Sequence, residues 1–230
     1  MLMANQSTYK RLNVIDLNTI DYNDAWSLQK KYFEERRNNL VLDTLFLLEH
    51  PHTFTLGKVA DKNNLVWDEN ILAKKNVKVY DIDRGGDITY HGPGQIVGYP
   101  IIDLSLWEKD THQYLRALEQ VIMNVCLDYG IKTTRKKEYT GVWIEERKIC
   151  AIGIKISRWI TMHGFAFNVN TDLSMFDGII PCGIKDKEVT SLKKELNKEI
   201  DLNEVKERIV NNFVNVFSYS EFELKKNKNA

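Results

Sequence analysis

The residue with the clearest capacity for covalent chemistry is Cys182, which stands between Pro181 and Gly183. Proline removes a backbone donor and stiffens the chain beside the thiol, whereas glycine allows a substrate to approach it closely. The other two cysteines, Cys126 and Cys150, lie in apolar stretches typical of core packing. Cys182 is therefore the candidate nucleophile, and the alternative is a structural thiol.

A cysteine nucleophile usually works with a base. Four residues are candidates: Lys148, Lys155, His91 and His163. A lysine on a strand is commonly solvated, and it becomes a base only where burial or a local field lowers its pKa. A histidine within a strand can equally be a structural residue held by hydrogen bonds. The residue types alone leave the choice among the four open.

The densest glycine cluster lies in residues 84–95, where Gly85, Gly86, Gly92 and Gly94 surround polar side chains. Glycines permit positive φ angles and close contact between backbone and ligand, but the pattern is also typical of a hairpin or a bulge. The segment has neither the GxxxxGK[ST] pattern nor a GxGxxG pattern followed by a helix. Nucleotide binding is therefore weakly supported.

Composition narrows the class of protein. The chain has 230 residues, 43% hydrophobic and 28% charged, which suits one globular domain over residues 1–230. Lysine plus arginine and aspartate plus glutamate both number 32, which argues against nucleic acid as the main partner. No apolar run is long enough for a membrane span, and the first residues lack a signal-peptide pattern, so we expect a cytoplasmic protein. Three scattered cysteines without a CxxC pair predict no metal site.

The elements that must position these residues follow from hydrophobic periodicity. Helices are predicted at residues 23–38, with Asp21 or Asn23 as cap, and at 67–75, 111–129 and 203–217. Strands are predicted at residues 43–49, 77–82, 96–102, 141–145, 148–156 and 162–169. Residues 225–230 are expected to form a flexible tail. Short connections between strands favour an α+β fold with a largely antiparallel sheet.

Five short motifs, in order, carry a family resemblance. They are LEHP at 48–51 with TLG at 55–57, RGGDITYHGPGQ at 84–95, RKICAIG at 147–153, HGFAFN at 163–168 and PCGI at 181–184. From about residue 45 to residue 192 the chain closely resembles octanoyltransferase of lipoate biosynthesis, the lipoyl(octanoyl) transferase family. Each motif alone is weak, but five in the same order are highly specific.

The resemblance implies a mixed, mostly antiparallel central sheet with a smaller accessory sheet and flanking helices, similar to the biotin and lipoate protein ligase catalytic fold. It also implies transfer of an octanoyl group from acyl carrier protein to a lysine of a lipoyl domain. In the family pattern Cys182 matches the nucleophile, and Lys148, not Lys155, matches the residue that activates it. The walls of the acyl pocket match Arg84, Gly85, Gly86, Asp87, Ile88, Thr89, Tyr90, His91, Ala151, Ile152, Gly153, Gly164, Phe165 and Ala166.

The implied partners are octanoyl-acyl carrier protein as donor, and as acceptors the lipoyl domains of 2-oxoacid dehydrogenase complexes and the H protein of glycine cleavage. No cofactor, no metal, no membrane and a monomer are expected. Three alternatives stay open: an ATP-dependent lipoate–protein ligase on the same fold, a cysteine thioesterase, and a carrier-binding module with a structural cysteine.

Strand alternation raises one conflict with this assignment. Successive side chains of a strand point to opposite faces, so Lys148 should lie with Cys150 and Ile152, and away from Ala151 and Gly153. Either the backbone lines the site at some of these positions, or the strand twists or bulges near Lys148. Residues 157–162 are bulkier than is typical of the family and could alter the rim of the pocket.

Overall fold

The computed structural model describes residues 10–180 and 188–226, which form two sheets and five α-helices. The seven-stranded sheet has the order β10 (Glu221–Lys226), β1 (Arg11–Thr19), β2 (Asp43–Glu49), β6 (Gln95–Ile101), β9 (Ile160–Asn168), β8 (Arg147–Ser157) and β7 (Val142–Ile144). β1 pairs in parallel with both β10 and β2, and every other pairing is antiparallel. The predicted mixed, mostly antiparallel sheet is confirmed.

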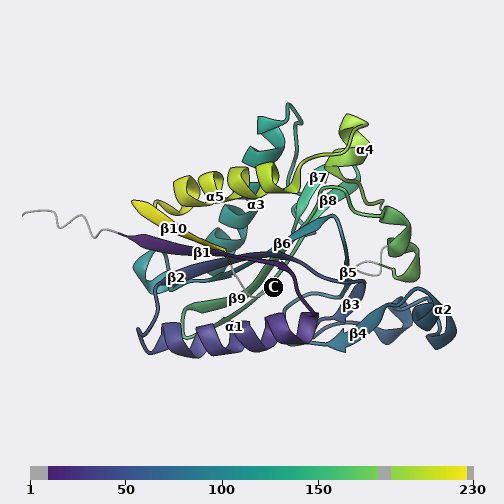
Figure 1. Cartoon of the computed structure of the whole chain (residues 1–230), viewed down its shortest axis with the longest axis horizontal. Coiled ribbons are helices and arrows are strands. Elements are labelled where there is room, and N and C mark those ends of the chain that lie inside the picture. The colour runs from purple at the N-terminus through teal and green to yellow at the C-terminus, as the bar shows by residue number, and fades with distance from the viewer. Residues whose placement is uncertain (1–9, 181–187, 227–230) are drawn as a thin grey trace, which may run out of the picture.

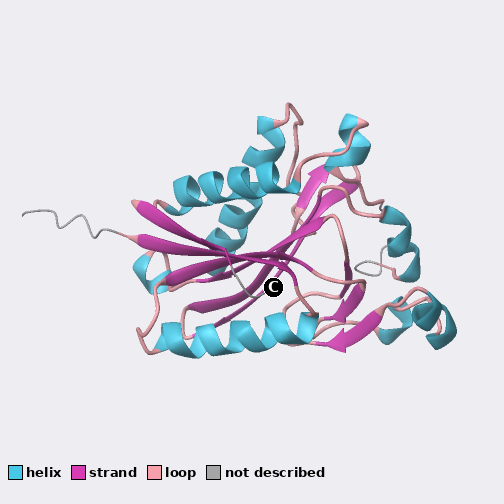
Figure 2. Cartoon of the chain, viewed as in Figure 1, coloured by secondary structure: helices cyan, strands magenta, loops and turns pink. Residues whose placement is uncertain are grey.

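The second sheet is small and lies beside one end of the first (Figure 2). Its order is β4 (Lys78–Asp81), β3 (Thr53–Leu56) and β5 (Ile88–His91), with β3 parallel to β4 and antiparallel to β5. The short helix α2 (Glu69–Lys74) packs on it, and Phe54, Ile88 and Tyr90 are buried in its core. β5 lies within the glycine-rich segment of residues 84–95, so the accessory sheet brings that segment next to the large sheet.

Helices cover both faces of the large sheet (Figure 1). α1 (Tyr22–Arg37) packs on one face against β6 and β9, while α3 (Thr111–Asp128) and α5 (Leu202–Phe217) cover the other; α4 (Leu192–Leu196) is a short turn of helix. Aspartates cap the three long helices, and the Asp21 side chain accepts from the Asn23 N–H at the start of α1. The apolar residues accordingly divide into a large core under α3 and α5 and a smaller one under α1.

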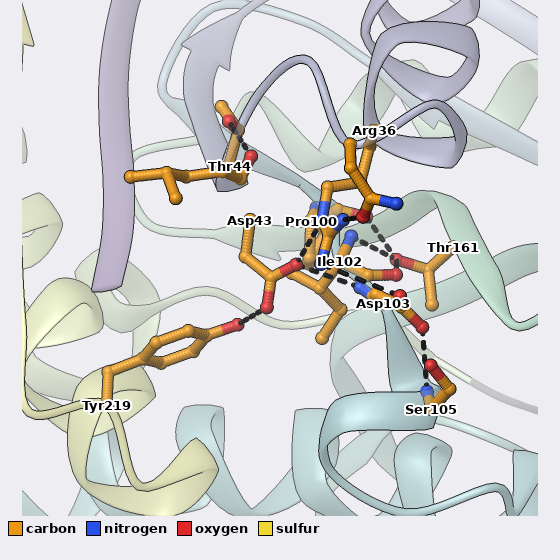
Figure 3. A network of polar contacts seen from close by, with 11 residues as sticks. Arg36, Asp43, Thr44, Pro100, Ile102, Asp103, Ser105, Thr161 and Tyr219 are labelled. Carbon is orange, nitrogen blue, oxygen red and sulfur yellow. Dashed lines mark hydrogen bonds and ion pairs between the residues drawn. The ribbon is translucent and has the colours of Figure 1, made fainter. Parts of the chain in front are cut away.

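A buried polar network fixes the end of α1 to the sheet (Figure 3). Arg36 Nε lies 2.8 Å from Asp43 Oδ1, and the Tyr219 hydroxyl donates to Asp43 Oδ2 at 2.7 Å. The Asp103 N–H also donates to the Asp43 carboxylate. Because a buried carboxylate is costly unless it is paired and hydrogen-bonded, these contacts tie together α1, β2 and the segment after α5.

The predicted helices and strands form near their predicted bounds, and β2 matches at both ends. Strands β1, β3, β5 and β10 were not predicted. The predicted tail was wrong for Lys225 and Lys226, which belong to β10, while residues 227–230 lie outside the described residues. The apolar side chains of β10, Phe222 and Leu224, are 44% and 50% exposed, so the segment has little core character. It forms a strand because it pairs with β1, which is distant in the sequence. Within the described ranges, no helix is both long and apolar enough to cross a bilayer.

Candidate active site

A cavity of about 560 Å³ lies beside the β8–β9 hairpin, and the glycine-rich segment lines part of it. Of the predicted pocket walls, all but one line it: Arg84, Gly85, Gly86, Asp87, Ile88, Thr89, His91, Ala151, Ile152, Gly153, Gly164, Phe165 and Ala166. The predicted base Lys148 lines it as well. Residues from three separated stretches of sequence, 84–91, 148–153 and 164–166, are therefore gathered around one cavity.

Tyr90 is the exception, since it does not line this cavity. Its ring packs in the core of the small sheet against Phe54 and Phe176, and its hydroxyl lies 2.7 Å from His52 Nδ1. Alternation along β5 is the physical cause, since neighbouring Thr89 lines the cavity on the opposite face.

Two cross-strand pairs of small residues form the floor of the cavity. Ala151 pairs with Ala166, and Gly153 pairs with Gly164. A Cβ atom on Gly153 would lie 2.9 Å from Arg84 Cδ and 3.0 Å from the Gly85 carbonyl oxygen. The Gly85 N–H donates to the Ile154 carbonyl at 2.9 Å, which holds the glycine-rich segment over this floor. Together with the glycine-rich segment, these small residues bound one part of the cavity, which we call the slot.

A bulge in β8 resolves the conflict over Lys148. Val142 of β7 pairs with Cys150, whereas the next residue, Trp143, pairs with Lys148, so Ile149 is the extra residue. Ile149 and Cys150 are both fully buried in the core under α3 and α5. Lys148 therefore lines the same cavity as Ala151, as bulges are known to re-aim a side chain next to active sites.

Lys148, near the start of β8, lies between Trp143 of β7 and the segment that follows residues 181–187. Its N–H donates to the Glu188 carbonyl at 2.9 Å, and its carbonyl accepts from the Thr190 N–H at 3.0 Å. Its ammonium lies 4.8 Å from the centroid of the Trp143 ring, a cation–π distance. The alternative lysine, Lys155, instead pairs with Asp83.

A chain of hydrogen bonds connects the glycine-rich segment with this edge. His91 Nδ1 donates to Gln95 Oε1 at 2.9 Å, and Gln95 Nε2 donates to Asn168 Oδ1 at 2.9 Å. Asn168 Nδ2 then donates to the Thr190 carbonyl at 3.0 Å. Gln95 and Asn168 line the cavity but were not predicted as site residues, although both stand in motifs of the sequence. Alternation from Ala166 would have indicated Asn168.

Both cysteines among the described residues are in the core. Cys126 and Cys150 are both fully buried, and burial raises the pKa of Cys126 to about 12 and that of Cys150 well above its ordinary value. Neither lines the cavity. The predicted nucleophile, Cys182, lies outside the described residues.

The end of the cavity away from Lys148 is polar. Tyr22, Tyr99 and His163 line it there, none of them predicted as pocket walls, and His163 had been considered only as a base. Burial lowers the pKa of His163, of His91 and of nearby His50, so all three rings are neutral near pH 7. Residues 157–162 do not line the cavity, since Arg158 and Trp159 form the distant β8–β9 turn at φ angles of +51° and +66°. Among the described residues no group of three potential metal ligands occurs.

Sequence comparison shows which family this chain is similar to. The lipoyl protein ligase A/B catalytic domain family matches residues 21–214. An octanoyltransferase from Christiangramia forsetii is 48% identical over 225 residues, which cover 90% of this chain and 96% of that protein.

Solved structures share the fold at low sequence identity. A crystal structure of lipoate-protein ligase A bound with ATP superposes with a TM-score of 0.75 at 15% identity, covering 96% of this chain and 90% of that one. A biotin protein ligase from Aquifex aeolicus in complex with biotin and ATP gives a TM-score of 0.56 at 17% identity, covering 90% and 70%. The chain belongs to the lipoyl protein ligase A/B catalytic domain family and, within it, to the octanoyltransferases, which are acyltransferases.

Proposed function

We propose that this octanoyltransferase takes its octanoyl group from octanoyl-acyl carrier protein and delivers it to a lysine of a lipoyl domain through a thioester on Cys182. The observation that carries the proposal is that Lys148 lines the same cavity as the small Ala151–Ala166 and Gly153–Gly164 pairs. The acceptors we propose are the lipoyl domains of 2-oxoacid dehydrogenase complexes and the glycine cleavage H protein.

In the first step the Cys182 thiolate attacks the carbonyl carbon of the carrier thioester. Lys148 accepts the proton of the Cys182 thiol, and its positive charge then favours the thiolate. The carbon–sulfur bond to the carrier breaks, Lys148 gives that proton to the departing carrier sulfur, the carrier leaves as a thiol, and an enzyme thioester forms. One thioester replaces another, so the step needs no external energy source.

In the second step the acceptor amine attacks the enzyme thioester. The bond to Cys182 breaks, an amide forms, and the proton lost by the amine returns to Cys182 through Lys148. Cysteine suits both steps because it is a good nucleophile and a good leaving group. Conversion of a thioester to an amide is downhill, so we expect transfer without ATP.

Burial of the other two thiols supports the choice of Cys182. Cys126 and Cys150 are fully buried and do not line the cavity, and burial raises the pKa of each thiol. A reactive cysteine needs the opposite environment, exposed and near positive charge. The described chain resumes at Glu188, which binds the backbone of Lys148.

The test is a transfer assay with octanoyl carrier protein, a lipoyl domain and no ATP. We expect an amide-linked octanoyl group on the domain with wild type, and loss of at least a hundredfold in rate with Cys182→Ala and Lys148→Met, a size typical for removal of a positioned proton-transfer group. Lys155→Met is the matched control. Strict dependence on ATP would favour a ligase. Free octanoate produced equally with and without the domain would favour a thioesterase.

A further inference from the structure

The indole ring of Trp143 is held in place beside Lys148. Trp143 is the middle residue of the short strand β7, and its side chain is 1% exposed. Its N–H donates to the Thr134 carbonyl at 3.0 Å, and its carbonyl accepts from the Thr134 N–H at 2.8 Å. Its indole Nε1 donates to the Tyr139 carbonyl at 3.3 Å. Trp143 does not line the cavity itself, so it can act on the site only through a neighbour.

The bulge in β8 brings Lys148 to this ring. In a regular ladder Trp143 would lie opposite Ile149. Because Ile149 is the extra residue of the bulge, Lys148 lies opposite Trp143 instead. Side chains of directly opposed residues lie close together, and the Lys148 ammonium is 4.8 Å from the centroid of the indole ring. The bulge therefore gives Lys148 two contacts at once, with the cavity and with the ring.

An aromatic ring distinguishes the two protonation states of a lysine. The negative face of the ring attracts an ammonium ion through its charge, and indole attracts it more strongly than the phenyl ring of phenylalanine does. A neutral amine carries no net charge and gains far less. In the proposed reaction Lys148 is an ammonium ion after it has taken the Cys182 proton. The contact with Trp143 therefore favours the charged form of this base.

The other charged groups around Lys148 are largely paired with one another. Lys136 contacts the same ring, with its ammonium 5.2 Å from the centroid, but it also pairs with Glu146, which offsets its charge. It therefore repels the Lys148 ammonium only weakly. Further titratable residues of the elements packed around Lys148 are Glu138, Tyr139, the buried thiol of Cys150, Glu188, Arg147 with its partners Glu145 and Glu195, and Glu119 of α3 with its partners Arg116 and Arg135.

We propose that Trp143 is a positioning residue for octanoyl transfer: its ring holds the half-buried Lys148 ammonium beside the cavity and favours the charged form of this base. This inference rests on the proposed function, since it concerns the same base. Because Trp143 acts through Lys148, its replacement should change the reactivity of the site only while Lys148 is present.

The first test is an NMR titration of the lysine side chains, labelled with ¹³C at the ε carbon. The Lys148 signal is the one that is missing in Lys148→Met. We expect Trp143→Leu to raise the acid dissociation constant of Lys148 about two- to fivefold, the factor that corresponds to a partly exposed cation–π contact. Trp143→Phe, which changes the packing less, should give a smaller rise. An unchanged titration midpoint in both variants overturns the proposal.

The second test is a double-mutant cycle, read through alkylation of Cys182 near neutral pH. We expect Trp143→Leu to slow alkylation about two- to fivefold, and Trp143→Phe to slow it less. In the Lys148→Met background, Trp143→Leu should have no further effect, because the partner of the ring is gone. The same slowing in both backgrounds would mean that Trp143 acts through packing alone, and it would overturn the proposal.

Trp107→Leu is the matched control for the loss of a tryptophan. The Trp107 ring packs against Phe217 of α5 and does not line the cavity. This variant should be less stable than wild type, but its alkylation rate and the titration midpoint of Lys148 should stay at the wild-type values. Changes as large as those in Trp143→Leu would show a general effect of lost packing and would contradict the role of Trp143.

Failure of this inference is distinguishable from failure of the proposed function. If Cys182→Ala still transfers octanoyl, the proposed nucleophile is wrong, and the titration of Lys148 still tests the ring: a lower midpoint in Trp143→Leu supports its effect on the base, and an unchanged one overturns it. If transfer requires both Cys182 and Lys148 but Trp143→Leu acts equally in both backgrounds, only the role of Trp143 is wrong.

Discussion

Val189 lies beside Lys148 in a parallel bridge, so the chain that follows residues 181–187 is hydrogen-bonded to the backbone of the proposed base. The bridge adds no strand of its own but fixes the chain on the carboxyl side of Cys182 to the edge of β8. The chain of hydrogen bonds from His91 through Gln95 and Asn168 ends at the neighbouring Thr190. The glycine-rich segment and the edge at Lys148 are thus held together by one network.

We expect Lys148 to set the reactivity of the Cys182 thiol. Because Cys126 and Cys150 are fully buried, alkylation of the folded protein reports on Cys182. Near neutral pH, Lys148→Met should slow alkylation about tenfold, since it removes the positive charge that favours the thiolate. Lys155→Met, whose side chain pairs with Asp83, should react at the wild-type rate. Equal rates in all three proteins would reject the assignment of Lys148.

Gly85 and Gly86 should respond differently to the same substitution. Gly86 has a φ of +89°, which an L-residue adopts only with strain, whereas a Cβ on Gly85 would meet the Ile154 carbonyl oxygen at an ordinary 3.4 Å. Gly86→Ala should cost about 1–2 kcal/mol in the segment over the slot and reduce octanoyl transfer severalfold. Gly85→Ala should retain most activity. Urea unfolding and transfer rates measure both effects, and an equal loss in the two variants would contradict this account of the segment.

Octanoyl loading should require a small side chain at Ala151. Its partner Ala166 faces it across the floor of the slot, so Ala151→Leu fills the space proposed for the acyl chain. We expect octanoyl loading to fall at least a hundredfold, the cost of a misplaced substrate, while butanoyl loading is affected less. Ser157→Leu, at the exposed end of the same strand, is the matched control. Normal octanoyl loading in Ala151→Leu would remove this floor from the acyl site.

Because His50 is buried, we expect the protein to lose stability in acid. Its Nδ1 donates to the Ile20 carbonyl and its Nε2 accepts from Tyr99, and burial lowers its pKa to about 4. The unfolded chain takes up a proton near pH 6.5 and the folded chain does not, so stability is full above pH 6.5 and declines as the pH falls toward 4.

Between pH 7.5 and 4.5 this residue alone should reduce the free energy of unfolding by about 2–3 kcal/mol. In His50→Gln the decline should be smaller by that amount, although the variant begins less stable at pH 7.5. Urea unfolding across the pH range measures it. A decline identical to that of wild type would show that His50 is not the source.

Local pattern predicted most of the fold, whereas the residues that line the cavity were indicated by the family resemblance. The run DTLFLLE gives β2 at both ends because it is a short apolar segment bounded by turns. β10 was missed because its alternating charged residues resemble a solvated end, and only pairing with distant β1 makes it a strand. The resemblance places Tyr90 among the pocket walls, whereas alternation along β5, a strand that was not predicted, puts its ring in the core of the small sheet.

The residues at the polar end of the slot could not be predicted from the sequence, for a different reason. Tyr22, Tyr99 and His163 belong to α1, β6 and β9, which meet only through the order of the sheet. The φ of +61° at His163 also breaks the alternation that would assign its side chain to a face. The bulge at Ile149, by contrast, was foreseen as one of the ways to bring Lys148 to the slot.

The central claim is a covalent octanoyl thioester on Cys182 alone, formed without ATP. Intact mass should show one octanoyl group after wild type is mixed with octanoyl carrier protein, and peptide mass should place it on Cys182. A lipoyl domain should then remove it as an amide on the domain's lysine. Cys182→Ala should not load, whereas Cys126→Ser and Cys150→Ala should. An adduct on Cys150, or loading that persists in Cys182→Ala, would contradict the mechanism.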